Sequence, residues 1–344
     1  MNLTQVAIFT HQFIIFFFAA LVIGIISFVG YRIWYANYLA SLPPIEIKPD
    51  VSWGVLPAPE FSTITNVSPT NFSYSVDTVT GNLPVVEKIT KVFFMPKAVA
   101  TLLSADRSRT IADKLKLTGE PEIISPTLYR YTDQVRQLTV DLDSGNFKYA
   151  IASVPPTIEP IEGSEAVLIQ GFRNLLSSMN ILTTELQNSP AKVTYLRYEG
   201  EELVPASIND AQAAEIAIWP QSVEEKSVVT TPFNQALIKA LVVRSAKDPE
   251  NYLSISFTFW PIDTSSFATY PVKTADQALA DLKAGQGVVS IAPSNPNISL
   301  TSVYLSYFQS EGYTPYLQPI FVFEGPGFVA YVPAITAQYL TATP

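Results

Sequence analysis

The sequence predicts an α+β protein in which a single N-terminal transmembrane helix is followed by antiparallel sheets, each packed by one or two helices. Three observations lead to this prediction. The chain opens with a long uncharged apolar stretch, several later segments alternate apolar and polar residues, and a few others repeat apolar residues at helical spacing. Of the 344 residues, 48% are hydrophobic and only 15% are charged, so the chain can bury a large core.

The transmembrane prediction depends on residues 13–31, which contain no charged side chain. At a rise of ~1.5 Å per residue, this stretch is about 28 Å long as a helix, close to the ~30 Å of hydrocarbon in a bilayer. Aromatic rings that favour the head-group layer come directly after it, and one arginine can extend to the interface. The residues assigned to the anchor are Phe13, Phe17, Leu21, Ile25, Val29, Tyr31, Arg32 and Trp34.

A cleaved signal peptide is the alternative for this stretch. It would need a basic start, a shorter apolar core and small residues before the cleavage site, whereas no Lys or Arg precedes the stretch and Tyr38 stands where a small residue is expected. We therefore predict an uncleaved anchor in the cell membrane. Arg32 favours a cytoplasmic location for the residues C-terminal to it, but large domains cross membranes regardless of flanking charge, so we expect the bulk of the chain to be extracytoplasmic.

Proline-rich segments divide the rest of the chain. Six prolines between residues 43 and 69 interrupt regular structure there, although the apolar piece 51–57 is expected to dock on the domain as a short strand. A second proline-rich break, at residues 154–163, is expected to separate two folded halves. The predicted domains are an anchor at 1–40, a spacer with the docking strand at 41–70, a first α+β domain at 71–155 and a second at 160–344.

Capping residues and apolar periodicity locate the helices and strands of these domains. Short matching passages, such as residues 76–82 and 140–146, are consistent with a duplicated helix-on-sheet unit, although shared turn chemistry also produces such matches. Predicted helices cover residues 104–118, with Ser104 as N-cap and Gly119 as a left-handed stop; 165–178, capped by Ser164; and 275–284, with a Thr274–Gln277 capping box and Gly285 at its end. Predicted strands cover residues 71–77, 127–131, 137–141, 146–152, 193–198, 202–205, 214–219, 238–244, 252–261, 287–291, 300–308, 317–324 and 328–333.

Composition excludes several classes of function. The chain has no cysteine and one histidine, His11 beside the anchor, so thiol chemistry, multi-histidine metal centres and a Ser-His-Asp triad in the folded part are excluded. The net charge of −9 disfavours nucleic acid and anionic lipid as partners. We predict no catalysis, no metal and no cofactor, and the sequence identifies no small-molecule ligand.

Polar residues with suggestive spacing have simpler structural interpretations. Asp141 and Asp143 have calcium-loop spacing, but the bidentate Glu and the flanking helices of such a site are missing, so a hairpin turn is expected. Ser189 and Lys192 have Ser-x-x-Lys spacing but lead into a strand instead of opening a helix. Carboxylate pairs for glycoside hydrolysis would come from acidic turns that are usually solvated. These residues are Glu159, Glu162, Glu165, Glu199, Glu201 and Glu202.

Aromatic residues are frequent in the C-terminal strands, which is compatible with a platform that binds a peptide or a carbohydrate. Alternation sends about half of them to each face of a sheet, and a covering helix would turn the outward set into core. Whether this set is exposed therefore decides between a structural face and a recognition surface. The candidate interaction surface consists of Tyr304, Phe308, Tyr313, Tyr316, Phe321 and Phe323.

The C-terminal part resembles the YycI/YycH-type proteins. The resemblance lies in a helix with the sequence Ala-Asp-Gln-Ala-Leu-Ala-Asp-Leu-Lys-Ala-Gly at residues 275–285, followed by aromatic strands at 303–308, 316–323 and 328–334. The Asp-x-x-x-Gly hairpins are similar to those of PepSY-type domains. The resemblance implies a single-span extracytoplasmic protein with helices packed on antiparallel sheet, which acts by contacting other proteins, notably a membrane sensor kinase.

These observations predict a membrane-anchored binding or regulatory module that contacts another membrane or envelope protein. The anchor, the proline spacer and the missing catalytic residue types all fit this function. The alternative is a carboxylate-dependent hydrolase of cell-wall polymer, or a glycan-binding protein. A deep cleft with two desolvated acids would favour the enzyme, and a shallow surface with an open strand edge would favour the binding module.

Overall fold

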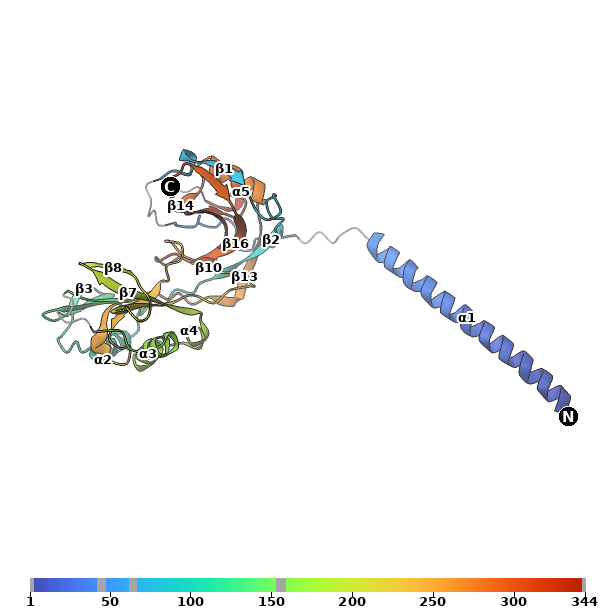
Figure 1. The fold of residues 1–344 in the computed structure, drawn as a ribbon, viewed down its shortest axis with the longest axis horizontal. Coiled ribbons are helices and arrows are strands. Elements are labelled where there is room, and N and C mark those ends of the chain that lie inside the picture. Colours follow the sequence, from blue (N-terminus) through green and yellow to red (C-terminus); the bar gives the residue numbers. More distant parts are fainter. Residues whose placement is uncertain (1–2, 42–47, 62–66, 153–158, 342–344) are drawn as a thin grey trace. The chain divides into compact units, whose positions relative to one another are not determined.

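A computed structural model of the chain shows the apolar N-terminal stretch as one helix, α1 (Leu3–Ser41) (Figure 1). The structure describes residues 3–41, 48–61, 67–152 and 159–341, and it separates two compact units, Met1–Lys48 and Pro49–Pro344. Within α1, residues Ala20–Tyr38 have a mean hydropathy of 1.3 and none is buried. Among the described helices, this is the one long and apolar enough to cross a membrane, a property that anchors and signal sequences share.

An antiparallel sheet of nine strands is the larger of the sheets in the second unit (Figure 1). Residues 122–151 form four strands joined by hairpins, and the last of these pairs with a strand about a hundred residues further along the chain, Phe147 opposite Phe257. In spatial order the strands are β3 (Glu122–Ser125), β4 (Leu128–Thr132), β5 (Arg136–Asp141), β6 (Phe147–Ile151), β12 (Tyr252–Phe257), β11 (Ile238–Val243), β9 (Ala213–Ile218), β7 (Ala191–Glu199) and β8 (Glu202–Pro205).

Three helices cover one face of this sheet: α2 (Ser104–Lys114), α3 (Glu165–Ser178) and α4 (Thr184–Asn188) (Figure 1). Alternate residues of the strands point towards them because successive strand side chains face opposite sides. Leu138 and Ile255 on the strands and Phe172 on α3 are among the fully buried members of this core. Burial of apolar area at roughly 25 cal/mol per Å² holds the helices on this face.

The second sheet has seven strands and is built mostly from the C-terminal part of the chain. One face packs against α5 (Ala275–Lys283), which begins with the predicted capping box: the Thr274 Oγ1 accepts from the Gln277 N–H at 3.2 Å, and the Gln277 Oε1 accepts from the Thr274 N–H at 2.9 Å. A two-stranded parallel sheet of β1 (Ser73–Val76) and β15 (Asn297–Leu300) lies beside it. The seven strands are β2 (Ile89–Phe94), β10 (Val228–Val229), β13 (Asp263–Pro271), β14 (Val288–Ile291), β16 (Ser302–Phe308), β17 (Tyr316–Gly325) and β18 (Phe328–Pro333).

The division of the folded part differs from the predicted domains 71–155 and 160–344. β6 and β12 are adjacent strands of one sheet, and β2, from the predicted first domain, pairs with β13, from the second. The chain thus enters the nine-stranded part after β2 and leaves it before β13, and it returns once to the second sheet in between, where β10 pairs with β16. The nine-stranded part is therefore inserted into the second sheet. Proline signals are local and do not report pairing between strands that are far apart in the sequence.

Residues 51–57 contact the folded part as predicted, through an isolated bridge instead of a strand. Leu56 is fully buried and pairs with Leu340, and the ring of Trp53 stacks on Tyr316 with centroids 4.9 Å apart.

Several element predictions need correction. Helix α2 ends before residue 118, because Lys116 and not Gly119 adopts the left-handed conformation, with φ of 63°. Leu103, not Ser104, is its N-cap. The strands β2, β3, β10, β13 and β15 and the helix α4 were not predicted. The two large sheets differ in strand order and in the helices they carry, so the structure gives no support to a duplicated unit.

Candidate functional site

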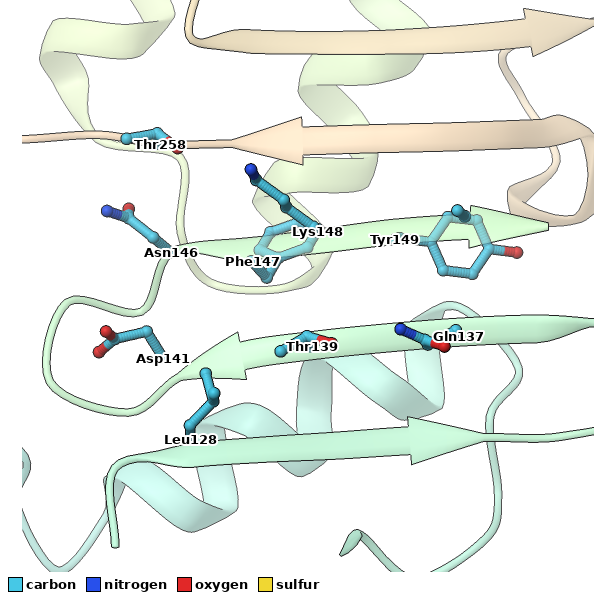
Figure 2. A pocket seen from close by; sticks show the side chains of 10 residues that line it. Leu128, Gln137, Thr139, Asp141, Asn146, Phe147, Lys148, Tyr149 and Thr258 are labelled. Carbon is cyan, nitrogen blue, oxygen red and sulfur yellow. The ribbon is translucent and has the colours of Figure 1, made fainter. Parts of the chain in front are cut away.

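The face of the nine-stranded sheet opposite the helices is the candidate functional site. In Figure 2, helices lie behind the strands, while Lys148, Thr139 and Asp141 stand in front of them. The alternation explains this difference: Phe147 and Tyr149, on either side of Lys148, are buried in the helix-side core, whereas the Lys148 side chain is 70% exposed. We call this side of the sheet the open face.

A shallow hollow of about 380 Å³ lies on the open face, over β4, β5, β6 and the end of β12 (Figure 2). Its walls offer hydroxyl, amide, carboxylate and ammonium groups, and apolar atoms make up more than half of the lining surface. Such a mixture suits a polar macromolecular surface better than a small apolar ligand, which prefers an enclosed cavity. The residues that line it are Leu128, Gln137, Thr139, Asp141, Asn146, Phe147, Lys148, Tyr149, Ala150 and Thr258.

A row of side chains in strict register crosses the open face and carries most of its charge. From β4 onwards, each member lies between two strand neighbours that pack in the helix-side core, which places the row on the opposite side. Four of its eight positions are Lys or Arg and one is acidic. From β3 to β7 the row consists of Glu122, Arg130, Thr139, Lys148, Ser256, Lys239, Ala217 and Lys192. We call Arg130, Lys148, Lys239 and Lys192 the cationic row.

This concentration of positive charge is unusual for the chain. Outside α1, whose one cation is Arg32, the sequence has 20 Lys and Arg against 30 Asp and Glu. The described partners of the row are exposed or weak. The Lys148 Nζ lies 2.7 Å from the exposed Glu311 carboxylate, the Arg130 guanidinium lies 3.5 Å from the Glu122 carboxylate, and the Lys239 Nζ lies 3.5 Å from the Gln235 amide oxygen. Exposed ion pairs of this kind contribute roughly 0–1 kcal/mol each, so a ligand can replace them.

The turn beside the hollow confirms the predicted hairpin of residues 141–146. The Asp141 Oδ1 accepts from the backbone N–H groups of Asp143 and Ser144 at 2.8 and 3.1 Å, and the Asp143 Oδ1 accepts from the Ala100 N–H at 2.7 Å. The Asp141 carboxylate thus bonds to backbone donors of its own turn, which is the ordinary role of Asp in a hairpin, whereas the Asp143 carboxylate bonds to the segment that precedes α2.

A second hollow of about 310 Å³ is lined by two carboxylates that the sequence analysis did not single out, Glu185 of α4 and Glu224. Burial raises the pKa of the Glu185 carboxyl above its ordinary value. Glu224 lies in a tight turn with φ of 51°, and its carboxylate is 2.7 Å from the Lys91 ammonium. Glu199, one of the acids that were considered, instead pairs with Arg197 on an exposed strand end.

The three phenylalanines of the predicted aromatic interaction surface are not exposed to solvent. Phe308, Phe321 and Phe323 are buried, with at most 4% of each exposed. Helix α5 belongs to the core that covers Phe321 and Phe323, and Phe308 packs against Phe61 on the other side of the sheet. The sequence shows which residues are aromatic but not that both faces are covered.

The three tyrosines of that predicted surface are half-buried and engaged within the fold. The Tyr304 hydroxyl donates to the Glu324 carboxylate, and the Tyr313 hydroxyl donates to the Met95 carbonyl at 2.9 Å. Tyr316 stacks on Trp53 of the docking element.

The anchor residues lie on α1 as predicted, and those with described side chains are exposed: Phe17, Leu21, Ile25, Val29, Tyr31 and Trp34 range from 44% to 60%. The Phe13 side chain lies outside the described residues. The Arg32 guanidinium lies 5.7 Å from the centre of the Phe28 ring. Near the end of α1, Trp34 stacks on Tyr38 with ring centroids 5.7 Å apart.

The cationic row was not predicted, because its members lie far apart in the sequence and become neighbours only through the strand order. A weak signal was present, since Lys148, Lys192 and Lys239 each interrupt an apolar run at a strand position. No protein-family model matches this chain, and no curated protein matches it.

Proposed function

We propose that the protein is a membrane-anchored, extracytoplasmic binding module that acts through protein–protein contacts in the cell envelope and performs no catalysis. The observation that carries this proposal is the open face of the nine-stranded sheet, which has a shallow hollow and a cationic row and which none of the helices α2, α3 and α4 covers. The apolar helix α1 supports membrane attachment.

The chemistry of the open face supports a protein as the bound partner. Small hydroxyl and methyl side chains, such as those of Thr139, Ser256 and Ala217, separate the cations, and half-buried apolar residues, including Leu241, lie at the neighbouring register. Such a mixture of charged, hydroxyl and apolar groups is typical of non-obligate protein interfaces. The resemblance of residues 275–334 to YycI/YycH-type proteins favours a membrane sensor kinase as the class of partner.

Site-specific photocrosslinking in cells tests this function. A photoreactive residue at Gln137 or Ala150 on the open face should give the same crosslinked protein, and one at Ser177 on the exposed side of α3 should not. Crosslinking that is equal from both faces, or absent from the open face, would refute the proposed surface. The full-length chain should also remain in the membrane fraction after an alkaline wash, and its release by that wash would refute the anchor.

The second candidate function is a carboxylate-dependent hydrolase of cell-wall polymer. The observation that favours it is the hollow shared by Glu185, whose pKa is raised, and Glu224, whose carboxylate pairs with the Lys91 ammonium. A protonated acid and an ionised carboxylate are the two groups that glycoside hydrolysis requires. Release of reducing ends from isolated cell-wall glycan, lost in both Glu185→Gln and Glu224→Gln, would establish this function in place of the first.

A further inference from the structure

We infer that the open face binds an acidic segment of a partner protein in an extended, polyproline-like conformation, with a carboxylate at about every third residue. This inference rests on the proposed function and specifies the chemistry of the partner. The evidence for it is the spacing of the cationic row, the shape of the sheet beneath it and the groups between the cations.

The four cations are evenly spaced across the sheet. Arg130 lies on β4, Lys148 on β6, Lys239 on β11 and Lys192 on β7, so one strand without a cation lies between each successive pair. Strands are about 4.8 Å apart, which places successive cations at intervals of roughly 10 Å and the whole row over about 29 Å. A polyproline-like chain rises ~3.1 Å per residue with three residues per turn, so every third side chain returns to the same face after about 9.3 Å.

An extended chain suits this row better than a helix does. Adjacent strands are rotated by roughly 20–25°, so the six strand steps between Arg130 and Lys192 accumulate a rotation of more than about 100°. A straight helix cannot follow such a surface over ~29 Å, whereas a chain without internal hydrogen bonds can. Two positions between the cations are Thr139 and Ser256, whose hydroxyls can bond to the free backbone groups of such a chain.

The surroundings of the row favour a sparsely charged protein segment over a continuous polyanion. Asp141 lines the same hollow as Lys148, and Glu215 lies beside Leu241 at the neighbouring register, so carboxylates flank the cations. The exposed Glu311 carboxylate pairs with Lys148, and one carboxylate of the bound segment replaces it there. A polymer with a negative charge at every unit would be repelled by these flanking carboxylates. A segment with carboxylates only at every third residue places its charges at the cations and reduces this repulsion.

The test measures binding of synthetic peptides to the full-length protein in detergent. The first probe is a twelve-residue peptide with four Glu-Pro-Ser repeats, and the second has the same composition with its four glutamates in succession. We expect the spaced peptide to bind at least about threefold more tightly and its affinity to fall with added salt. Equal binding of the two peptides would overturn the inferred spacing.

Charge-reversal variants locate the binding site. Lys239→Glu with Lys192→Glu should weaken binding of the spaced peptide by roughly tenfold or more, because each exposed ion pair contributes up to about fivefold and reversal adds repulsion. The matched control, Lys247→Glu with Lys283→Glu, changes two exposed lysines elsewhere by the same total charge and should bind as the wild type does. Lys239→Gln with Lys192→Gln checks that loss of binding does not reflect misfolding, because this milder pair should show a smaller loss. Equal affinity in all variants would overturn the inference.

The remaining outcomes separate this inference from the proposed function. If open-face crosslinks to a partner form in cells and the spaced peptide does not compete with them, the protein is still a binding module but the inferred partner chemistry is wrong. If inorganic polyphosphate of equal charge competes as well as the spaced peptide, the site takes polyanions and the assignment to a protein segment is wrong. If no open-face crosslink forms, the proposed function itself fails.

Discussion

The Lys148 ammonium lies 2.7 Å from the Glu311 carboxylate, and this ion pair connects the open face of the nine-stranded sheet to the segment after β16. Both side chains are at least half exposed, so water screens the pair and its contribution to folding is small. We predict that Lys148→Ala lowers the free energy of unfolding by less than about 1 kcal/mol. Urea denaturation measures this value, and a loss above about 2 kcal/mol would show that the pair fastens the two sheets together.

Two buried tyrosines on nearby strands differ in whether their hydroxyls have partners. The Tyr131 hydroxyl is 2.8 Å from the Ser108 Oγ, which itself donates to the Ala105 carbonyl, so Tyr131 is the donor of the pair. The Tyr149 hydroxyl is buried and makes no hydrogen bond. We predict that Tyr131→Phe lowers the free energy of unfolding by about 1 kcal/mol, while Tyr149→Phe leaves it unchanged or raises it, because burial of an unpaired hydroxyl is unfavourable.

Thermal unfolding of the two variants under the same conditions checks this contrast. Each substitution removes one oxygen from the same core, so a difference between the variants reports hydrogen bonding and not packing. Equal destabilisation by both would mean that the Tyr149 hydroxyl has a partner, such as an ordered water.

Gly171 in the middle of α3 lies against Ala246. A Cβ at position 171 would stand 2.8 Å from both the Cβ and the carbonyl oxygen of Ala246, closer than real contacts allow. Helix propensity alone favours alanine over glycine by about 1 kcal/mol, so the two effects have opposite signs. We predict that Gly171→Ala destabilises the protein by about 1–3 kcal/mol, because overpacking outweighs propensity.

Gly119→Ala is the matched control for this prediction. Its added Cβ would make an ordinary contact, 3.7 Å from the Thr132 carbonyl oxygen, and the residue does not have a left-handed φ. Denaturation should show little change for this variant. Stabilisation by Gly171→Ala would mean that α3 can move away from residue 246.

Local patterns in the sequence predicted the fold class and most of its elements. Thr274 and Gln277 predicted the start of α5, Ser164 predicted the start of α3, and alternation predicted strands that match β4 to β9, because each signal depends on residues within one turn or one hairpin. The pairing of β6 with β12 and of β2 with β13 was not predictable from one sequence. These pairings depend on which distant strands meet, and no local rule specifies that.

The candidate site was less predictable than the fold, for the same reason. Lys148, Lys239 and Lys192 are individually ordinary lysines, and only the strand order places them in one row. The predicted aromatic surface was wrong for a different reason. Phe321 and Phe323 are evident in the sequence, but their burial beneath α5 is not. Composition shows which catalytic residue types are absent, and the strand order determines which of the other side chains become neighbours.

Glu185 should make the stability of the protein depend on pH. Burial raises the pKa of its carboxyl in the folded state, so the folded chain binds a proton more tightly than the unfolded chain does. Stability then falls as the pH rises from the unfolded pKa through the folded pKa, and the cost of the buried charge is fully present above it. We predict that Glu185→Gln equals the wild type in stability at a pH below the unfolded pKa and exceeds it at neutral pH. Glu199→Gln, at an exposed strand end, is the control and should show no such difference. Chemical denaturation of the three proteins across this pH range gives the comparison, and a wild type that is more stable than Glu185→Gln at neutral pH would show that the ionised carboxylate has a stabilising partner at the hollow.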